Sequence, residues 1–278
     1  MSSVNSAPVA GGDDGIRGVR IKIMAFLLTT PLADLLPFAS PSLDPQIIER
    51  EMATLRLSYG SEALLISTSQ ALKDCEAGAL QNKVVLVTGG SKGFGREYAV
   101  RAAGFGAKVV IGARGAEGVE EVVKKIRKAG GQATGLSTDV SLWEAQLALF
   151  KHGLETYGSI DVVVANAGIF EGGLLLEDKV TENGKLAKPD VSTIEINVLG
   201  SIYTSKLAFH YLSQHSTHSH KALIILGSLT SYIPSPGCPL YVTSKHALLG
   251  LQRSLALESE GKGIRCATPS ESPAFQLY

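Results

Sequence analysis

Cysteine is scarce in this sequence, and its few cysteines are not paired. The three residues, Cys75, Cys238 and Cys266, are an odd number and stand far apart. A disulfide framework, a zinc site or a redox dithiol would need cysteines in paired spacing. We therefore expect a reducing, cytoplasmic location, with cysteines that act as small buried hydrophobic side chains.

The sequence also lacks an excess of charge of either sign. It contains 26 lysines and arginines against 26 aspartates and glutamates, so its formal net charge is zero. A protein that gathers nucleic acid or an anionic membrane from a distance needs a field of one sign. We expect neither partner, and a charged ligand would have to be bound by local groups.

An apolar run long enough to cross a membrane is missing as well. The most apolar stretch near the start, Ile21 to Phe38, is interrupted by Pro31, Asp34 and Pro37. A membrane-spanning helix needs roughly 20 consecutive apolar residues. We interpret the stretch as weakly structured or surface-packed, and the protein as soluble.

Strands and helices alternate regularly only from Lys83 onward. Residues 1–81 are rich in Ser, Gly, Asp and Pro at their start and contain one plausible short helix, Gln46 to Leu57. We predict that 1–81 form a partly disordered extension of unknown role and that 82–278 form the functional domain.

Short β-branched runs separated by amphipathic segments are typical of βαβ units in a parallel sheet. Right-handed crossovers then give a Rossmann-type doubly wound α/β fold of three layers, α/β/α, with ligands at the carboxyl ends of the strands. The predicted strands are Val84–Val87, Lys108–Ile111, Gln132–Ser137, Asp161–Ala165, Ala222–Leu226 and Ile264–Ala267.

Two of the helices between these strands can be placed from their side chains. Ser141 and Glu144 fit an S-x-x-E capping box, which predicts a helix from there to about Thr156. Another helix, between the second and third strands, has an apolar stripe at helical spacing. Its members are Val119, Val122, Val123 and Ile126.

A glycine-rich segment, Thr88-Gly-Gly-Ser-Lys-Gly-Phe-Gly95, follows the first predicted strand and precedes a helix. Its glycines permit a tight turn and a close approach to a pyrophosphate, whose charge a helix N-terminus stabilises. Glycine-rich turns are common, so the glycines alone are weak evidence for a phosphate site. The position of the segment between a strand and a helix makes the prediction stronger. The expected cofactor contacts here are Gly89, Ser91, Lys92, Gly93, Phe94 and Gly95.

The end of the second predicted strand indicates which dinucleotide is bound. A carboxylate there would accept hydrogen bonds from the ribose of NAD, whereas a cation would pair with the 2′-phosphate of NADP. The segment ends on Arg114 without a carboxylate, and Lys92 adds a second cation nearby. We predict NADP over NAD; the alternative is that Arg114 is a solvated surface residue.

A tyrosine and a lysine stand four residues apart, as Tyr241 and Lys245, at the start of an apolar helix. Residues at i and i+4 share a helix face about 6 Å apart, so the ammonium can stand beside the phenol and lower its pKa from about 10. Ser228, after the fifth strand, can hydrogen-bond the substrate oxygen that Tyr241 protonates. Each residue alone has an ordinary structural interpretation; together they favour a catalytic site.

These motifs resemble the short-chain dehydrogenase/reductase family over about Lys83 to Ala267. The segments 188–211 and 241–255 look like its hydroxyprostaglandin-dehydrogenase-like branch. Besides the glycine segment, Ser228 and the Tyr–Lys pair, the resemblance rests on Asp139, Val140, Asn166, Ala167, Gly168 and Asn197.

The resemblance implies an NAD(P)-dependent oxidoreductase that interconverts a small carbonyl compound and an alcohol. Tyr241 would be the general acid or base, Ser228 would orient the substrate, and Lys245 would tune Tyr241 and bind the ribose. Asn197 would hold a water that links Lys245 to solvent, and Asp139 would contact the adenine. Related proteins pair through the helices that here contain Asn197 and Tyr241, which implies a homodimer.

The sequence departs from the family near its C-terminal end. Family members usually continue with a Pro-Gly turn, a helical lid over the substrate and a seventh strand; here Pro269 is the one hint of that turn. We therefore expect a truncated chain whose sheet lacks its last strand, and the substrate cannot be predicted. The alternative to an enzyme is a catalytically inactive dinucleotide-binding protein or a non-functional truncated form.

A histidine cluster, His215, His218 and His220, is the one group that suggests a metal site. It has no Cys or carboxylate beside it, and its Ser and Thr residues indicate a loop before the fifth strand. We therefore expect no metal.

Overall fold

The computed structural model describes residues 80–171, 175–215, 221–259 and 261–268. Several predictions concern residues outside these ranges and are not tested by it. They are the extension up to residue 79 with its apolar stretch and short helix, Cys75, His218, His220 and Pro269.

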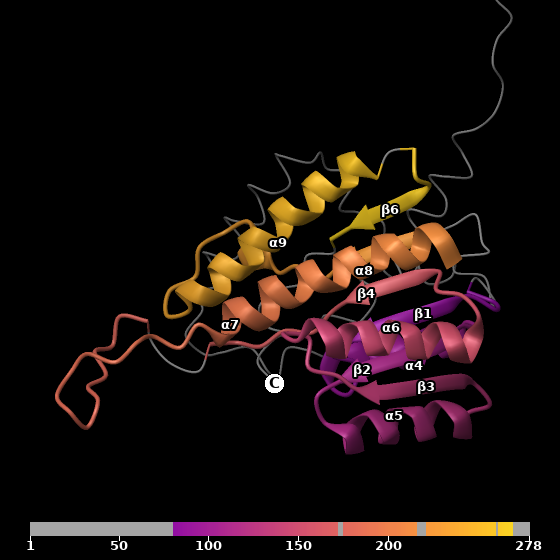
Figure 1. The fold of residues 1–278 in the computed structure, drawn as a ribbon, viewed down its shortest axis with the longest axis horizontal. Helices are drawn as coiled ribbons and strands as arrows, with labels where there is room; N and C mark the ends of the chain where they lie inside the picture. Colours follow the sequence, from indigo (N-terminus) through magenta and orange to yellow (C-terminus); the bar gives the residue numbers. More distant parts are fainter. Residues whose placement is uncertain (1–79, 172–174, 216–220, 260, 269–278) are drawn as a thin grey trace, which may run out of the picture. The chain divides into compact units, whose positions relative to one another are not determined.

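A parallel sheet of six strands forms the centre of the described fold (Figure 1), in the order β3-β2-β1-β4-β5-β6. The chain crosses from β3 at one edge to β4 in the middle, so β1 and β4 flank the point where the strand order reverses. The predicted doubly wound Rossmann-type fold is confirmed. The strands are β1 (Val84–Thr88), β2 (Lys108–Ala113), β3 (Gln132–Ser137), β4 (Val162–Ala165), β5 (Lys221–Ile225) and β6 (Ile264–Ala267).

The central strands β1 and β4 are buried along their whole length. A parallel strand covered by helices on both faces needs apolar side chains in both directions, and these valine-rich runs provide them. The predicted strands agree with the observed ones within one or two residues. Strand β4 begins one residue later than predicted, at Val162; Asp161 stands just before it, and its carboxylate accepts a hydrogen bond from the amide of Val84 at 2.8 Å.

The helices follow the predicted alternation. In α5 the predicted stripe of Val119, Val122, Val123 and Ile126 is buried. The main helices are α4 (Gly93–Gly104), α5 (Ala116–Lys128), α6 (Trp143–Tyr157), α8 (Gly200–His215) and α9 (Pro239–Glu258). The short elements are α7 (Ser192–Ile194), the π-helical turn η3 (Glu195–Leu199) and the 3-10 turn η4 (Leu229–Ser231).

The prediction that Ser141 caps helix α6 is wrong. The hydroxyl of Ser141 donates a hydrogen bond to Asp139 at 2.7 Å, and the helix begins at Trp143 with Leu142 as an N-cap that makes no side-chain bond. Asp139 competes successfully for this hydroxyl because its carboxylate also accepts the backbone N–H of Ser141 at 2.9 Å.

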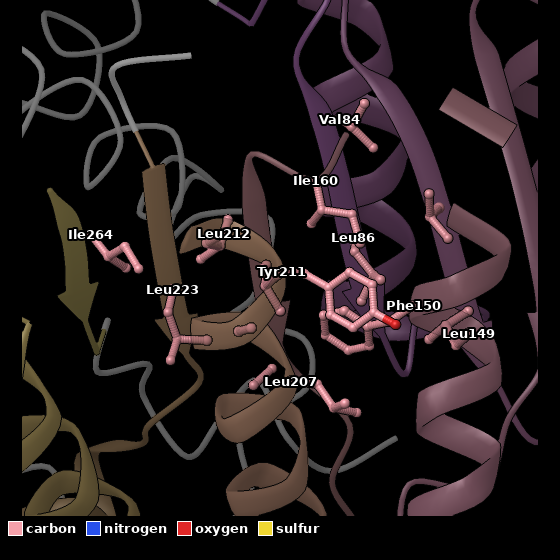
Figure 2. Packing of buried hydrophobic residues seen from close by; sticks show 14 of the residues in the cluster. Val84, Leu86, Leu149, Phe150, Ile160, Leu207, Tyr211, Leu212, Leu223 and Ile264 are labelled. Atoms are coloured by element: carbon pink, nitrogen blue, oxygen red, sulfur yellow. The ribbon is translucent and has the colours of Figure 1, made fainter. Parts of the chain in front are cut away.

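One apolar core lies between the sheet and helices α6, α8 and α9 (Figure 2). Phe150 of α6 and Tyr211 of α8 meet there with ring centroids 5.2 Å apart. Strand residues such as Leu86 and Leu223 contribute from the sheet and are fully buried. Since side chains alternate along a strand, their neighbours face α4 and α5 on the other side. The described domain therefore has the expected three layers.

Candidate active site

The loops that follow β1, β4 and β5 meet at the carboxyl edge of the parallel sheet. Thr88 ends β1, and its hydroxyl accepts hydrogen bonds from the backbone amides of Asn166 at 3.1 Å and Ala167 at 3.2 Å. The side chain of Asn166 donates back to the carbonyls of Thr88 at 2.9 Å and Gly89 at 3.2 Å. These bonds join the first part of the Asn166–Gly168 motif to the glycine segment.

The glycine segment adopts a backbone that other residues would resist. Gly89 and Gly93 have φ angles of +67° and +51°, in the left-handed region. A Cβ on Gly95 would collide with the side-chain nitrogen of Asn166 and the carbonyl oxygen of Gly89. Helix α4 begins at Gly93, and its N-cap Lys92 makes no side-chain capping bond. Backbone N–H groups at this helix start are therefore suited to an anionic group.

The other predicted residues of this segment lie beside it. Ser91 is half-buried, and a Cβ on Gly118 near the start of α5 would approach the Cβ of Ser91 to 3.1 Å. Phe94 stacks on Tyr98 within α4, with ring centroids 6.2 Å apart. The side chain of Lys92 is exposed.

Arg114 and Asp139 lie at the same edge, after β2 and β3. Arg114 is exposed, and its carbonyl accepts a hydrogen bond from the hydroxyl of Ser137 at 2.8 Å. The hydrogen bond from the Ser141 hydroxyl holds the pKa of Asp139 below its usual value; the Ser141 amide and the Arg114 charge act in the same direction, against a smaller effect of burial. Val140 is buried, and its carbonyl accepts a bond from Gln146 at 2.6 Å.

Four predicted catalytic residues are buried on elements that pack together. Tyr241 and Lys245 are 4% exposed, and Ser228 and Asn197 are completely buried. A buried lysine is rare unless it has partners. The Nζ of Lys245 lies 5.5 Å from the centre of the Tyr241 ring and donates a hydrogen bond to the carbonyl of Leu226, after β5, at 3.0 Å. The ammonium therefore lies near the aromatic ring of Tyr241.

Ser228 caps the turn η4, which packs against α9. Its hydroxyl oxygen accepts hydrogen bonds from the amide of Thr230 at 3.2 Å and from its hydroxyl at 3.0 Å. Because a hydroxyl has one hydrogen and two lone pairs, this arrangement leaves the Ser228 hydrogen for donation. A carbonyl or alkoxide oxygen is an acceptor of the kind that such a donor binds.

Asn197 lies in the π-helical turn η3 and clamps the loop after β4. Its Oδ1 accepts the amide of Ile169 at 2.8 Å, and its Nδ2 donates to the carbonyl of Ile169 at 2.9 Å. The same nitrogen donates to the Ser244 hydroxyl at 3.0 Å, which donates in turn to the carbonyl of Tyr241 at 2.7 Å. Both amide hydrogens are therefore used within the protein.

Sequence reasoning missed three residues that support this site. The sequence indicates Thr88 only as part of the glycine segment, and Ser244 only as a spacer between Tyr241 and Lys245. It indicates no role for Glu171, whose carboxylate accepts the backbone N–H of Tyr241 at 2.7 Å. The one available signal was position: Glu171 closely follows the Asn166–Gly168 motif, and Ser244 directly precedes Lys245.

Together the site offers a buried phenol beside an ammonium, a serine hydroxyl and a turn suited to phosphate. These groups can transfer a proton to or from a bound oxygen. Among the residues that the structure describes, no cluster of His, Cys, Asp or Glu could hold a metal ion, and no helix is long and apolar enough to span a membrane.

Comparison with known proteins finds relatives of one family for the region that contains this site. The profile of the family described as short chain dehydrogenase matches residues 83–269. A short-chain dehydrogenase/reductase of Acremonium egyptiacum is 32% identical over 184 residues, which are 66% of this chain and 60% of that protein. An uncharacterized oxidoreductase of Thermotoga maritima is 36% identical over 185 residues, 66% of this chain and 69% of that protein.

A 3beta-hydroxysteroid dehydrogenase of Mediterraneibacter gnavus is 32% identical over 189 residues, covering 68% of this chain and 65% of that protein. The chain spans less than two thirds of the length of several curated relatives, including 60% of the Acremonium protein.

Two solved structures share the fold. A putative short-chain alcohol dehydrogenase from Sinorhizobium meliloti superposes with a TM-score of 0.58 at 31% identity, over 68% of this chain and 71% of that one. A short chain dehydrogenase/reductase from Burkholderia phymatum, solved in complex with NAD, gives a TM-score of 0.61 at 24% identity, over 69% and 66%. At that identity the second likeness shows the fold alone.

Proposed function

This chain belongs to the short-chain dehydrogenase family, and on that premise we propose that it is an NAD(P)-dependent oxidoreductase that interconverts an alcohol and a carbonyl compound. The observation that carries the proposal is the burial of Tyr241, Lys245 and Ser228 at the sheet edge where the glycine turn also lies. A protein that only bound a dinucleotide would have no need of this arrangement.

The residues at the edge fit a dinucleotide. Gly95 has no Cβ, which would collide with the Asn166 side chain, so the glycine turn can pack against the loop after β4. Helix α4 begins in this turn without a side-chain cap, and a helix N-terminus favours an anionic group such as a pyrophosphate. When bound, the nicotinamide supplies hydride transfer. The residues that would hold the cofactor are Gly89, Ser91, Lys92, Gly93, Phe94, Gly95, Arg114, Asp139, Val140, Asn166, Ala167, Gly168, Tyr241 and Lys245.

In alcohol oxidation the Tyr241 oxygen takes the hydroxyl proton, and in carbonyl reduction it returns a proton to the same oxygen. The nearby Lys245 ammonium favours the phenolate through its charge. Ser228 donates its hydrogen to the substrate oxygen and stabilises negative charge there. Asn197, through Ser244 and Ile169, holds the loop and helix that carry these groups.

We propose NADP as the preferred cofactor. Arg114 is exposed at the end of β2, and Lys92 is exposed at the start of α4, so two cations are available to a 2′-phosphate. The charge of Arg114 has only a small effect on Asp139, whose carboxylate is held mainly by hydrogen bonds from Ser141. Asp139 therefore does not prevent Arg114 from binding a 2′-phosphate.

A small-molecule substrate, a homodimer and a cytoplasmic location complete the proposal; the hydroxyprostaglandin-dehydrogenase-like branch stays a prediction. Exposed Leu199 and Ile202, in η3 and α8, support an apolar contact between two copies along this helical segment. Light scattering on the purified protein tests the dimer, which a monomeric mass at micromolar concentration would contradict.

Turnover tests the function directly. Purified protein is expected to oxidise NADPH with at least some members of a ketone and aldehyde panel, and to reduce NADP with the matching alcohols. Tyr241→Phe removes the proton-transferring oxygen, so it should lose at least about a hundredfold in kcat while its dissociation constant for NADPH stays within about twofold.

A protein that enhances NADPH fluorescence but turns over no substrate would instead be an inactive dinucleotide-binding protein. Substantial activity in Tyr241→Phe would contradict the assignment of the acid and base.

A further inference from the structure

Helix α9, which carries Tyr241 and Lys245, has no cap from its own segment. Cys238 is the N-cap residue and makes no side-chain capping bond, and Pro239 has no N–H to satisfy. The first turn of a helix leaves backbone N–H groups without partners inside the helix. The N–H of Tyr241 is one of them, and it donates to Oε2 of Glu171 at 2.7 Å.

Glu171 reaches this helix from a distant part of the chain. It lies 70 residues before Tyr241, in the connection between β4 and α7. Its neighbour Phe170 packs on the phenol ring of Tyr241, with ring centroids 4.9 Å apart. The loop therefore contacts both the backbone N–H and the aromatic ring of Tyr241.

The same loop is tied to the glycine segment and to Asn197. Asn166 donates to the carbonyl of Gly89, and Ile169 exchanges two hydrogen bonds with Asn197. One short segment, 166–171, thus runs from the proposed phosphate turn to the first turn of α9. A shift of Glu171 would move the start of the helix on which the phenol stands.

A cap that served stability alone would not need a glutamate at position 171, because burying its carboxylate costs free energy. Its second oxygen, Oε1, is buried and has no hydrogen-bond partner among the described residues. An unsatisfied buried oxygen of a carboxylate costs free energy, and such groups in native proteins call for an explanation. A site where geometry must be exact within fractions of an ångström provides one.

We propose that Glu171 is a positioning residue for Tyr241, which holds the phenol in register with the cofactor loop by accepting the tyrosine's own N–H. This inference rests on the proposed oxidoreductase function. It concerns an acceptor oxygen rather than a charge, so a glutamine that presents its amide oxygen in the same place keeps the contact, and an alanine loses it.

The test compares Glu171→Ala, Glu171→Gln and the control Glu177→Ala in the full chain. Glu177 lies on the same connection before α7 with its side chain exposed. We expect kcat to fall about ten- to a hundredfold in Glu171→Ala and to stay within about threefold in Glu171→Gln and Glu177→Ala. The KM for the dinucleotide should change by less than about twofold in all three, because the phosphate turn is intact.

Hydrogen exchange at the Tyr241 amide, measured by NMR, provides a readout that needs no activity. Exchange should accelerate at least about tenfold in Glu171→Ala and stay near the wild-type rate in Glu171→Gln and Glu177→Ala. All rates are measured below the unfolding temperature of every variant. If Glu171→Ala does not fold, Glu171→Asp replaces it, because aspartate is too short to reach the Tyr241 amide without moving the loop.

Unchanged amide exchange in Glu171→Ala would overturn the contact itself. Wild-type kcat in Glu171→Ala, or an equal loss in Glu171→Gln, would overturn the positioning role, because the acceptor oxygen would then not matter. If the unmodified protein shows no turnover while amide exchange responds as expected, the oxidoreductase function fails and the positioning role fails with it, but the helix cap stands.

Discussion

The side-chain nitrogen of Asn197 lies 3.0 Å from the hydroxyl oxygen of Ser244, across 47 residues of sequence. The Ser244 hydroxyl in turn donates a hydrogen bond to the carbonyl of Tyr241. The π-helical turn η3 and the first turns of α9 are thus joined inside the protein. Asn197 is the buried residue of this turn, and such π-helical turns occur frequently at functional sites.

Replacing Asn197 with alanine should destabilise the protein strongly. The change removes the three hydrogen bonds of a completely buried side chain and takes away the partner of the backbone N–H and carbonyl of Ile169. We expect a loss of about 2–4 kcal/mol in the free energy of unfolding, measured by urea denaturation. Asn183→Ala, at an exposed position, should change it by less than about 0.5 kcal/mol. A loss below about 1 kcal/mol in Asn197→Ala would contradict the clamp.

Replacing Arg114 with alanine should change the choice of cofactor. If the guanidinium pairs with a 2′-phosphate, its loss weakens NADPH binding about ten- to a hundredfold and leaves NADH binding nearly unchanged. The dissociation constants are measured by titration of cofactor fluorescence. The control Arg253→Ala removes an exposed arginine from α9 and should leave both constants unchanged. Equal weakening of both cofactors would show that Arg114 does not recognise the phosphate.

Replacing Gly95 with alanine should weaken cofactor binding, whereas the same replacement at a glycine in another helix should not. The new methyl group meets the Asn166 side chain and the Gly89 carbonyl, so the turn must open, and we expect at least about tenfold weaker NADPH binding. In Gly250→Ala, within α9, the added Cβ meets no atom within 4 Å. That control should bind NADPH normally and gain up to about 1 kcal/mol in the free energy of unfolding. Normal NADPH binding by Gly95→Ala would show that the close packing of Gly95 against Asn166 and Gly89 is not needed for the cofactor site.

The stabilising contribution of Asp139 should depend on pH in a defined direction. Hydrogen bonds from Ser141 lower the pKa of Asp139 in the folded protein, so its charged form stabilises the fold above the unfolded-state pKa of about 3.9. This contribution is lost as the pH falls through the lowered folded value. Asp139→Asn should therefore be less stable than wild type at pH near 7, and the difference should shrink in acid.

Urea denaturation from neutral pH down to about pH 3 measures this convergence. Asp178→Asn, at an exposed position, is the matched control and should follow the wild type throughout. A difference for Asp139→Asn that is constant over the whole pH range would contradict a contribution from the charge.

The strands and the main helices could be predicted because each depends on neighbouring residues. Runs such as Val84–Thr88 are apolar in both directions, and Val119 to Ile126 repeat at helical spacing, so local pattern is enough. The start of α6 could not be predicted this way. Ser141 has the right spacing for a cap, but Asp139 offers its hydroxyl a stronger, charged acceptor.

The sequence by itself determined the order of strands and helices, the glycine turn and the helical face that Tyr241 shares with Lys245, since these follow from backbone freedom and periodicity over a few residues. Only the tertiary structure decided that Asn166 contacts Gly89, that Asn197 holds Ile169 and Ser244, and that Glu171 caps the helix of Tyr241. Those contacts join residues 28 to 77 positions apart, and such partners come together only when the sheet aligns the ends of its parallel strands at one edge.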